Sequence, residues 1–207
     1  MHVGKPLTSM VYEHVYDGIL SGDITNNDIL TENELAEKLA VSKAPVRGAL
    51  ILLCEEKVLR AIPRVGYQVL QITSGQVGKL AEARWALEPF LLEKAWPTLD
   101  AKKIRRLEDH LRASKKAELS KTSIAANWMR NIQFHMLLAG FAENEYLQGA
   151  LERVLKSCAR AATQYFLHIR GIPQGEMDKH DAIVAAIAGG DREAALNALR
   201  EDIREII

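Results

Sequence analysis

The stretch "NIQFH", residues 131–135, places an amide and an imidazole one helical turn apart inside a largely apolar segment. Because side chains four residues apart lie on the same face of a helix, Asn131 and His135 should both face the protein interior. One interpretation is a hydrogen-bonded pair in the core. The other is half of a metal site, since imidazole nitrogens and carbonyl oxygens are metal ligands.

Two further segments turn a polar side chain toward an apolar stripe. His180 precedes Ile183 by three residues, and Asp202 follows Leu199 by three. A buried imidazole or carboxylate needs hydrogen-bond partners or a cation. Each one alone is more often a satisfied core residue, but three helices that send such groups inward favour a shared site in the core of a helical bundle.

The segment 75–96 carries a charged residue in its apolar stripe. The residues of this stripe that we expect to face inward are Leu80, Arg84, Leu87 and Leu91. An unpaired charge inside a protein is very costly, so the arginine must meet an anion or an acceptor. Its partner is either Glu88, one turn further along the helix, or the carboxylate of a bound ligand.

The composition is that of a globular protein without a global charge. The 207 residues are 48% hydrophobic and 26% charged, a length that suits one large domain or two small ones. Lys plus Arg and Asp plus Glu both total 27, so any attraction to nucleic acid must come from a local basic patch. We find no signal peptide and no apolar run long enough to span a bilayer, and therefore expect a cytoplasmic protein with no membrane partner.

The N-terminal residues predict three helices and a β-ribbon. A helix over residues 8–21 ends at Gly22. A capping box of Thr31 and Glu34 begins the second helix, and Ser42 is the expected N-cap of the third. The stretch "LRAIPRVGYQVLQI" then changes to β-type residues around "PRVG", which predicts a two-stranded ribbon with a turn there. This order of elements is typical of a winged helix-turn-helix.

The rest of the chain is expected to be entirely helical. Breaks that contain Pro, Gly, Asn, Ser or Thr separate predicted helices over residues 75–96, 101–119, 123–141, 145–169, 175–188 and 192–206. The fold is therefore expected to be mostly α. It should comprise a winged helix-turn-helix domain over residues 1–72 and an all-helical bundle over residues 75–207.

Positive charge is concentrated on the expected recognition helix and ribbon. Residues 43–64 contain five basic side chains against two acidic ones, whereas residues 1–42 contain two lysines against seven acidic ones. The first turns of the recognition helix put Lys43 and Arg47 on one face, and Arg64 lies in the ribbon turn. Such a distribution suits contacts to DNA phosphates. The alternative is a charged group of helices that packs against the second domain.

These features resemble the winged-helix domain of GntR-type bacterial transcription regulators. The resemblance covers residues 8–70 and is carried by "ELAEKLAVSKAPVRGAL" and by the glycine of the ribbon. It implies that Ser42, Lys43 and Arg47 contact double-stranded DNA and that Gly66, at the tip of the wing, approaches the minor groove. Lys43 stands where the family usually has Arg, which removes a bidentate reader of guanine.

The helical half is similar to the FCD ligand-binding domain of the FadR-like branch of the same regulators. The resemblance covers residues 76–205, through "EARWALEPFLLEKA", "NIQFHMLLAGFAENEYL" and "DKHDAIVAAIAGGDREAALNALREDI". It implies a divalent metal site at Asn131, His135, His180 and Asp202. Many members use one Asp and three His, so Asn131 replaces an Asp and Asp202 replaces a His. The remaining set can still hold Zn²⁺, Ni²⁺ or Mn²⁺.

The expected function is a transcription regulator, in the first place a repressor, that binds a palindromic operator as a homodimer. A small carboxylate effector would bind at Arg84, Asn131, His135 and His180 and change the spacing of two winged helices. Two alternatives remain. One is a metal-free sensor, in which Asp202 hydrogen-bonds a histidinium and Asn131 contacts the ligand. The other is a metal-dependent hydrolase, but no general base or nucleophile motif accompanies the ligands, so enzymatic activity is not expected.

Overall fold

The computed structural model describes residues 5–118, 124–166 and 176–204. The chain divides into two compact units, Met1–Gln71 and Ile72–Ile207. The outermost residues of several predicted helices, and the ends of both predicted domains, lie outside the described residues, namely 1–4, 119, 123, 167–169, 175 and 205–207. Within the described ranges, no helix combines the length and the apolar character that a bilayer crossing demands.

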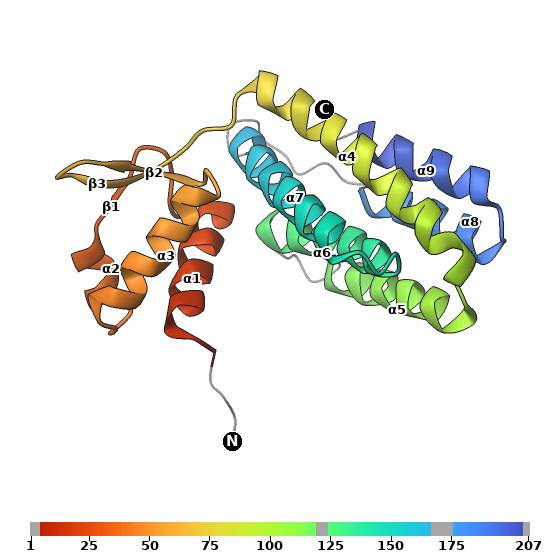
Figure 1. Cartoon of the computed structure of the whole chain (residues 1–207), viewed down its shortest axis with the longest axis horizontal. Helices are drawn as coiled ribbons and strands as arrows, with labels where there is room; N and C mark the ends of the chain where they lie inside the picture. The colour runs from red at the N-terminus through yellow and green to blue at the C-terminus, as the bar shows by residue number, and fades with distance from the viewer. Residues whose placement is uncertain (1–4, 119–123, 167–175, 205–207) are drawn as a thin grey trace. The chain divides into compact units, whose positions relative to one another are not determined.

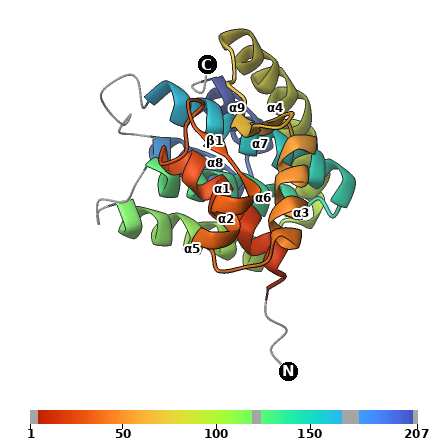
Figure 2. The same ribbon diagram turned by 90° about the vertical axis from the view of Figure 1, so that its left-hand side faces the viewer.

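The N-terminal unit begins with three helices, α1 (Leu7–Ser21), α2 (Glu32–Lys38) and α3 (Lys43–Glu55), as Figures 1 and 2 show. Helix α1 ends at Gly22, whose φ of 84° terminates it in the left-handed conformation. Thr31 caps α2 by accepting a hydrogen bond from the Glu34 amide. Both α1 and α2 pack on α3, and their fully buried core includes Val11, Val15, Val46, Ala49, Leu50 and Leu53.

The wing contains one strand more than the sequence predicts. The predicted ribbon is present as β2 (Leu59–Ile62) and β3 (Gly66–Val69), which pair antiparallel around the expected turn. A third strand, β1 (Ile29–Leu30), pairs antiparallel with the other edge of β3, so the sheet order is β1-β3-β2. Two residues are too few for an alternating pattern, and β1 is therefore invisible to periodicity.

Gly66 is required by this sheet. It has a φ of 149°, and a Cβ placed there would lie 2.5 Å from the backbone oxygen of Leu30. Any other residue would combine backbone strain with a clash against β1. A glycine at this position thus has a structural reason that is independent of DNA, and its approach to the minor groove stays a prediction.

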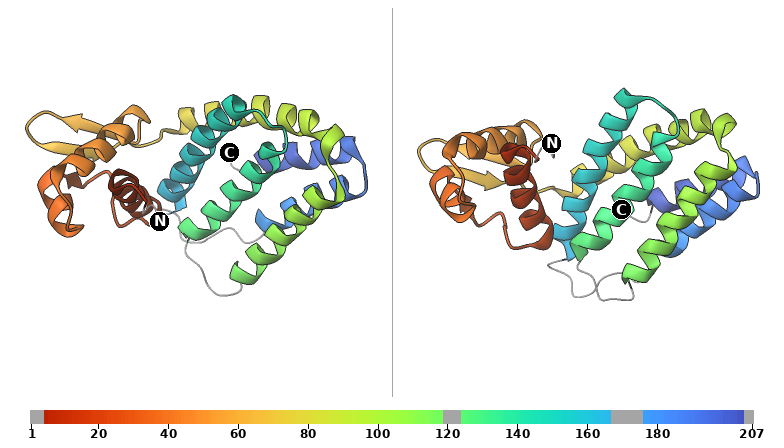
Figure 3. Two further views of the ribbon diagram at one scale, coloured as in Figure 1. Left: turned by 60° about the horizontal axis from the view of Figure 1, so that its bottom comes forward. Right: turned by 90° about the horizontal axis from the view of Figure 1, so that it is seen from below.

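The second unit is a bundle of helices. In chain order, its elements are α4 (Ser74–Ala95), the 3-10 turn η1 (Trp96–Thr98), α5 (Ala101–Glu118), α6 (Ile124–Gly140), α7 (Glu145–Phe166), α8 (Glu176–Ala188) and α9 (Arg192–Arg204). Helix α4 lies beside α7 and α9, as Figure 3 shows, and also packs on α6. The inner faces of these helices bury Leu91, Leu107, Phe134, Leu151, Leu155, Ile183 and Leu199.

The inward stripe of α4 differs from the predicted one. Arg84 and Leu91 are buried as expected, but Leu80 and Leu87 are partly exposed. Ala81 and Glu88 take the inward positions instead. The apolar pattern does not include Glu88 in this stripe, but its ion pair with Arg84 makes its burial tolerable.

Candidate polar site in the helical core

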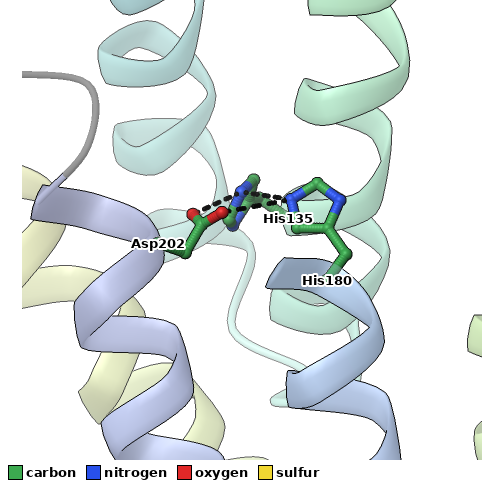
Figure 4. A group of neighbouring side chains, drawn as sticks. All are labelled: His135, His180 and Asp202. Carbon is green, nitrogen blue, oxygen red and sulfur yellow. Dashed lines mark hydrogen bonds and ion pairs between the residues drawn. The ribbon is translucent and has the colours of Figure 1, made fainter. Parts of the chain in front are cut away.

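Side chains from four helices meet in the interior of the second unit. Arg84 and Glu88 come from α4, His135 from α6, His180 from α8 and Asp202 from α9. All five are buried, with Arg84 at 0% exposure. Figure 4 shows His135, His180 and Asp202 turned toward one another between their helices. The structure therefore brings together residues that lie as many as 118 positions apart in the sequence.

The ligand atoms of this trio are closely spaced. The two Nε2 atoms of His135 and His180 are 3.3 Å apart. Asp202 Oδ2 lies 3.2 Å from the first of these nitrogens, and Oδ1 lies 3.4 Å from the second. One ligand atom from each residue falls within 4.8 Å of the others. Two nitrogens bound tetrahedrally to one zinc ion lie about 3.4 Å apart, so the donor set fits a single divalent ion.

Glu88 orients the ring of His135. Its Oε2 atom lies 2.7 Å from His135 Nδ1 and accepts the proton of that nitrogen. The other ring nitrogen, Nε2, then faces His180 and Asp202. A carboxylate that holds the outer nitrogen of a histidine is the usual support of a metal-binding imidazole, because it fixes both ring orientation and tautomer.

Arg84 forms ion pairs with both carboxylates, Glu88 and Asp202, through two of its three guanidinium nitrogens. Its Nε donates to Glu88 Oε1 at 2.5 Å, and its Nη2 donates to Asp202 Oδ2 at 3.1 Å. The predicted pair with Glu88 is thus present. The same Nη2 lies 3.2 Å from His135 Nε2. The remaining nitrogen, Nη1, is buried and has no hydrogen-bond partner among the described residues, so it is available to an added acceptor.

The charges of the cluster reinforce one another. Burial alone would raise the pKa of Glu88, but Arg84 and His135 outweigh it and lower the pKa to about 2. Burial would also raise the pKa of Asp202, yet His135 and His180 hold it well below its ordinary value. Burial would lower the pKa of His135, but Glu88 and Asp202 raise it to about 9. Without a metal, His135 is therefore a histidinium between two carboxylates.

His180 is kept neutral. Burial lowers its pKa, and the positive charge of His135 acts in the same direction, while Asp202 opposes both. Its ring stacks on Phe134, with ring centroids 4.0 Å apart. A neutral imidazole held in this way has a lone pair that can bind a cation or accept a hydrogen bond.

Asn131 lies at the edge of the cluster with an unsatisfied oxygen. Its Nδ2 is 3.5 Å from His180 Nε2, and its Oδ1 is buried without a partner in the part of the chain that the structure describes. The nitrogen and oxygen of an amide exchange places by a rotation of the group. The rotated amide would direct its oxygen toward the histidine nitrogens, where a cation would satisfy it.

The residues predicted to contact DNA lie on the N-terminal unit. Ser42 is at the N-cap position of α3, but its side chain makes no capping hydrogen bond. Lys43 is the exposed first residue of α3. Arg47, one turn on, is exposed and bound to Glu32. Arg64 is exposed in the turn between β2 and β3, with a φ of 65°. Their roles on DNA stay predictions.

One acidic residue of these sites is predicted only in part, and another is not predicted at all. The spacing of four residues predicts Glu88 as a partner of Arg84 but not its contact with His135. Glu32 binds Arg47 from a different helix, 15 residues away. No local sequence pattern predicts such a contact between two helices.

Two family profiles match the chain, the FCD domain over residues 79–205 and bacterial regulatory proteins of the gntR family over residues 7–69. The chain is 28% identical over 204 residues to the gluconate operon transcriptional repressor of Bacillus licheniformis. This alignment covers 91% of this chain and 78% of that protein. It is also 28% identical to the HTH-type transcriptional regulator YdhC of Bacillus subtilis, over 72% of this chain and 66% of that protein, just under two thirds of its length.

The solved structure of Escherichia coli McbR/YncC has the same fold. Its TM-score is 0.84 at 19% sequence identity, and the superposition covers 97% of this chain and 95% of that one. The predicted fold class, a winged helix-turn-helix followed by an all-helical bundle, is thereby confirmed.

Proposed function

Because this chain belongs to the gntR family of bacterial regulatory proteins and carries the FCD domain, we propose that it is a repressor whose affinity for operator DNA is set by a small carboxylate bound in the helical unit. The family and its relatives are transcriptional regulators rather than enzymes, so the hydrolase alternative is set aside. That one relative is a gluconate operon transcriptional repressor supports repression as the sense of regulation.

The observation that carries the effector proposal is a pair of buried polar atoms beside the charged cluster, which have no partner within residues 5–118, 124–166 and 176–204. Arg84 Nη1 is a donor that a carboxylate would satisfy, and Asn131 Oδ1 is an acceptor that a cation would satisfy. Leaving either group unpaired in the core is costly. A bound carboxylate together with a divalent ion would remove both costs at once.

His135, His180, Asp202 and Asn131 are the residues that would hold Zn²⁺, Ni²⁺ or Mn²⁺. Such an ion supplies an open coordination position for the effector carboxylate. Arg84 would bind the same carboxylate through Nη1, while Glu88 keeps the His135 ring in place. To bind the ion, His135 Nε2 would have to lose its proton, and the guanidinium would have to give up its 3.2 Å contact with that nitrogen.

A second candidate is a sensor without metal. It is supported by the histidinium state of His135, whose pKa is raised to about 9 and which pairs with both Glu88 and Asp202. In this state the cluster is already neutral overall, since two carboxylates balance one guanidinium and one imidazolium. The effector carboxylate would then meet Arg84 Nη1 and the Asn131 amide alone.

Metal analysis separates the two candidates. Protein purified without an affinity tag is expected to bind about one divalent ion per chain, and His180→Ala and Asp202→Ala are expected to lose it. His14→Ala, in the other unit, is the control and should retain the ion. Elemental analysis of the purified protein, followed by calorimetric titration with Zn²⁺, measures both. A carboxylate that raises the melting temperature of protein that takes up no ion would establish the metal-free sensor.

We also propose that two chains bind a palindromic operator as a homodimer in the cytoplasm, because one recognition helix reads only one half-site. Ser42, Lys43, Arg47 and Arg64 would face the duplex, with Gly66 near the minor groove. Sedimentation analysis should give twice the mass of one chain. A monomer at micromolar concentration, both with and without DNA, would contradict the dimer.

The proposed phosphate contacts predict a change in salt dependence. Lys43→Ala or Arg64→Ala should each reduce the slope of log affinity against log salt by about one. Lys79→Ala, on α4 of the helical unit, is the charge-matched control and should leave the slope unchanged. Fluorescence anisotropy with a labelled duplex of arbitrary sequence at several salt concentrations provides the measurement. An unchanged slope in both variants would exclude these residues from the DNA interface.

A further inference from the structure

Arg47, on the recognition helix, is held by a carboxylate of the preceding helix. Its Nε donates to Glu32 at 2.9 Å to Oε1 and 3.2 Å to Oε2, and its Nη2 donates to Oε2 at 2.7 Å. The carboxylate therefore occupies one edge of the guanidinium, the edge formed by Nε and Nη2. The other edge, formed by Nη1 and the second hydrogen of Nη2, has no partner among the described residues. The side chain is 61% exposed.

Glu32 is itself held from the wing. The hydroxyl of Tyr67, on β3, donates to Glu32 Oε1 at 3.4 Å, and the carboxylate side chain is only 21% exposed. The hydrogen bonds from Arg47 lower the pKa of Glu32, so that it is ionised near neutral pH. A chain of contacts thus runs from the wing through Glu32 to Arg47 and links three elements of the DNA-binding unit.

The remaining edge of Arg47 has the shape that reads guanine. An arginine recognises guanine with two parallel N–H donors aimed at O6 and N7. Arg47 is the only arginine in α2 and α3, and the first residue of α3 is a lysine, which has no such fork. Bidentate reading of guanine by these two helices therefore depends on this one side chain and on the direction in which it points.

A carboxylate beside a DNA-contacting arginine lowers affinity for every sequence, because it repels phosphates. Its presence is explained by specificity, which often needs an element that disfavours wrong partners. A free arginine rotates and finds phosphates on any duplex. An arginine fixed by Glu32 loses this freedom and meets its full set of acceptors only where a guanine lies in front of it.

We propose that Glu32 is a specificity-determining positioning residue, which holds Arg47 with its Nη1–Nη2 edge outward to read one guanine in each operator half-site. This inference rests on the proposed DNA-binding role of Arg47. It assigns to Glu32 a function in sequence discrimination rather than in affinity. Tyr67 supports that function from the wing.

The inference is tested by selection from a random duplex library with the full-length protein. The wild-type protein should enrich a palindrome with a guanine fixed in each half-site. Glu32→Ala should lose about tenfold or more of its discrimination at that guanine. It should keep the wild-type base preference at the other positions of the palindrome, and it should bind random duplex at least as well as wild type. Glu37→Ala removes the same charge from an exposed position of α2 and should select the wild-type sequence.

Arg47→Ala identifies which position the arginine reads, and the double variant Glu32→Ala/Arg47→Ala should be no less selective there than Arg47→Ala alone. If wild-type protein enriches no sequence, the proposed function falls and the inference falls with it. If wild type selects a palindrome and Glu32→Ala selects the same one with equal preference, the inference alone is overturned. A uniform loss of affinity for all sequences in Glu32→Ala would show a merely structural clamp and would overturn it too.

Discussion

Glu88→Ala is expected to lower the free energy of unfolding of the helical unit by about 3–5 kcal/mol, because it breaks a buried ion pair from one side. Arg84 is 0% exposed and would lose its closest acceptor. His135 would lose the carboxylate that accepts its Nδ1 proton. Both groups would be left with positive charge in the core, with Asp202 as the remaining counter-ion.

Tryptophan fluorescence during urea unfolding, in the presence of a chelator, measures this loss. All three tryptophans, at positions 85, 96 and 128, lie in the helical unit, so the signal reports that unit alone. Glu93→Ala is the matched control. It removes the same side chain from the same helix, but the pair with Arg192 is solvent-exposed, and we expect a change below about 1 kcal/mol.

The double variant Arg84→Met/Glu88→Leu shows whether the loss comes from uncompensated charge. Removing both partners leaves no unpaired guanidinium, although His135 Nδ1 still lacks its acceptor. The double variant should therefore be more stable than Glu88→Ala alone. A Glu88→Ala protein within 1 kcal/mol of wild type would mean that Arg84 finds another acceptor, and the description of the cluster would have to change.

Most element boundaries could be predicted because local chemistry sets them. Gly22 ends α1, Thr31 and Glu34 open α2, and the residues at "PRVG" turn the ribbon. These signals lie within a few residues of the boundary that they define. Strand β1 carries none of them, because its two residues become a strand only by pairing with β3. A partner that lies some 38 positions away has no local signature.

The residues that belong to the polar cluster could be predicted more fully than their arrangement and charge. Helical periodicity turned His135, His180 and Asp202 inward on three separate helices, and all three are buried. Periodicity cannot supply the charge state, which follows from distances between helices. The pKa of about 9 at His135 depends on Glu88 from α4. Glu88 could be predicted only as one of two possible partners of Arg84, because an isolated carboxylate is rarely buried.

The pair of Glu32 and Arg47 illustrates the same limit. Each residue is an ordinary exposed-type side chain in its own helix, and only the packing of α2 on α3 brings them to 2.7 Å. This contact between two helices matters for function, because buried and bridging polar contacts specify geometry at the expense of stability. Glu32 and Arg47 are therefore residues to test by mutation, although neither stands out in the sequence pattern of its own helix.

Gly66→Ala is expected to destabilise the wing by about 3 kcal/mol or more, since a φ of 149° strains any L side chain and the new methyl group would meet the Leu30 carbonyl. Hydrogen exchange should show faster opening of β1 and β3. Gly48→Ala, in α3 of the same unit, is the control: its Cβ would meet the Thr8 side chain, with the methyl carbon at 3.3 Å and the hydroxyl oxygen at 3.6 Å, and helix propensity offsets that contact. The exchange measurement needs no DNA. Unchanged protection of the wing, together with lost affinity in a separate DNA-binding measurement, would assign the importance of Gly66 to the minor groove instead of the sheet.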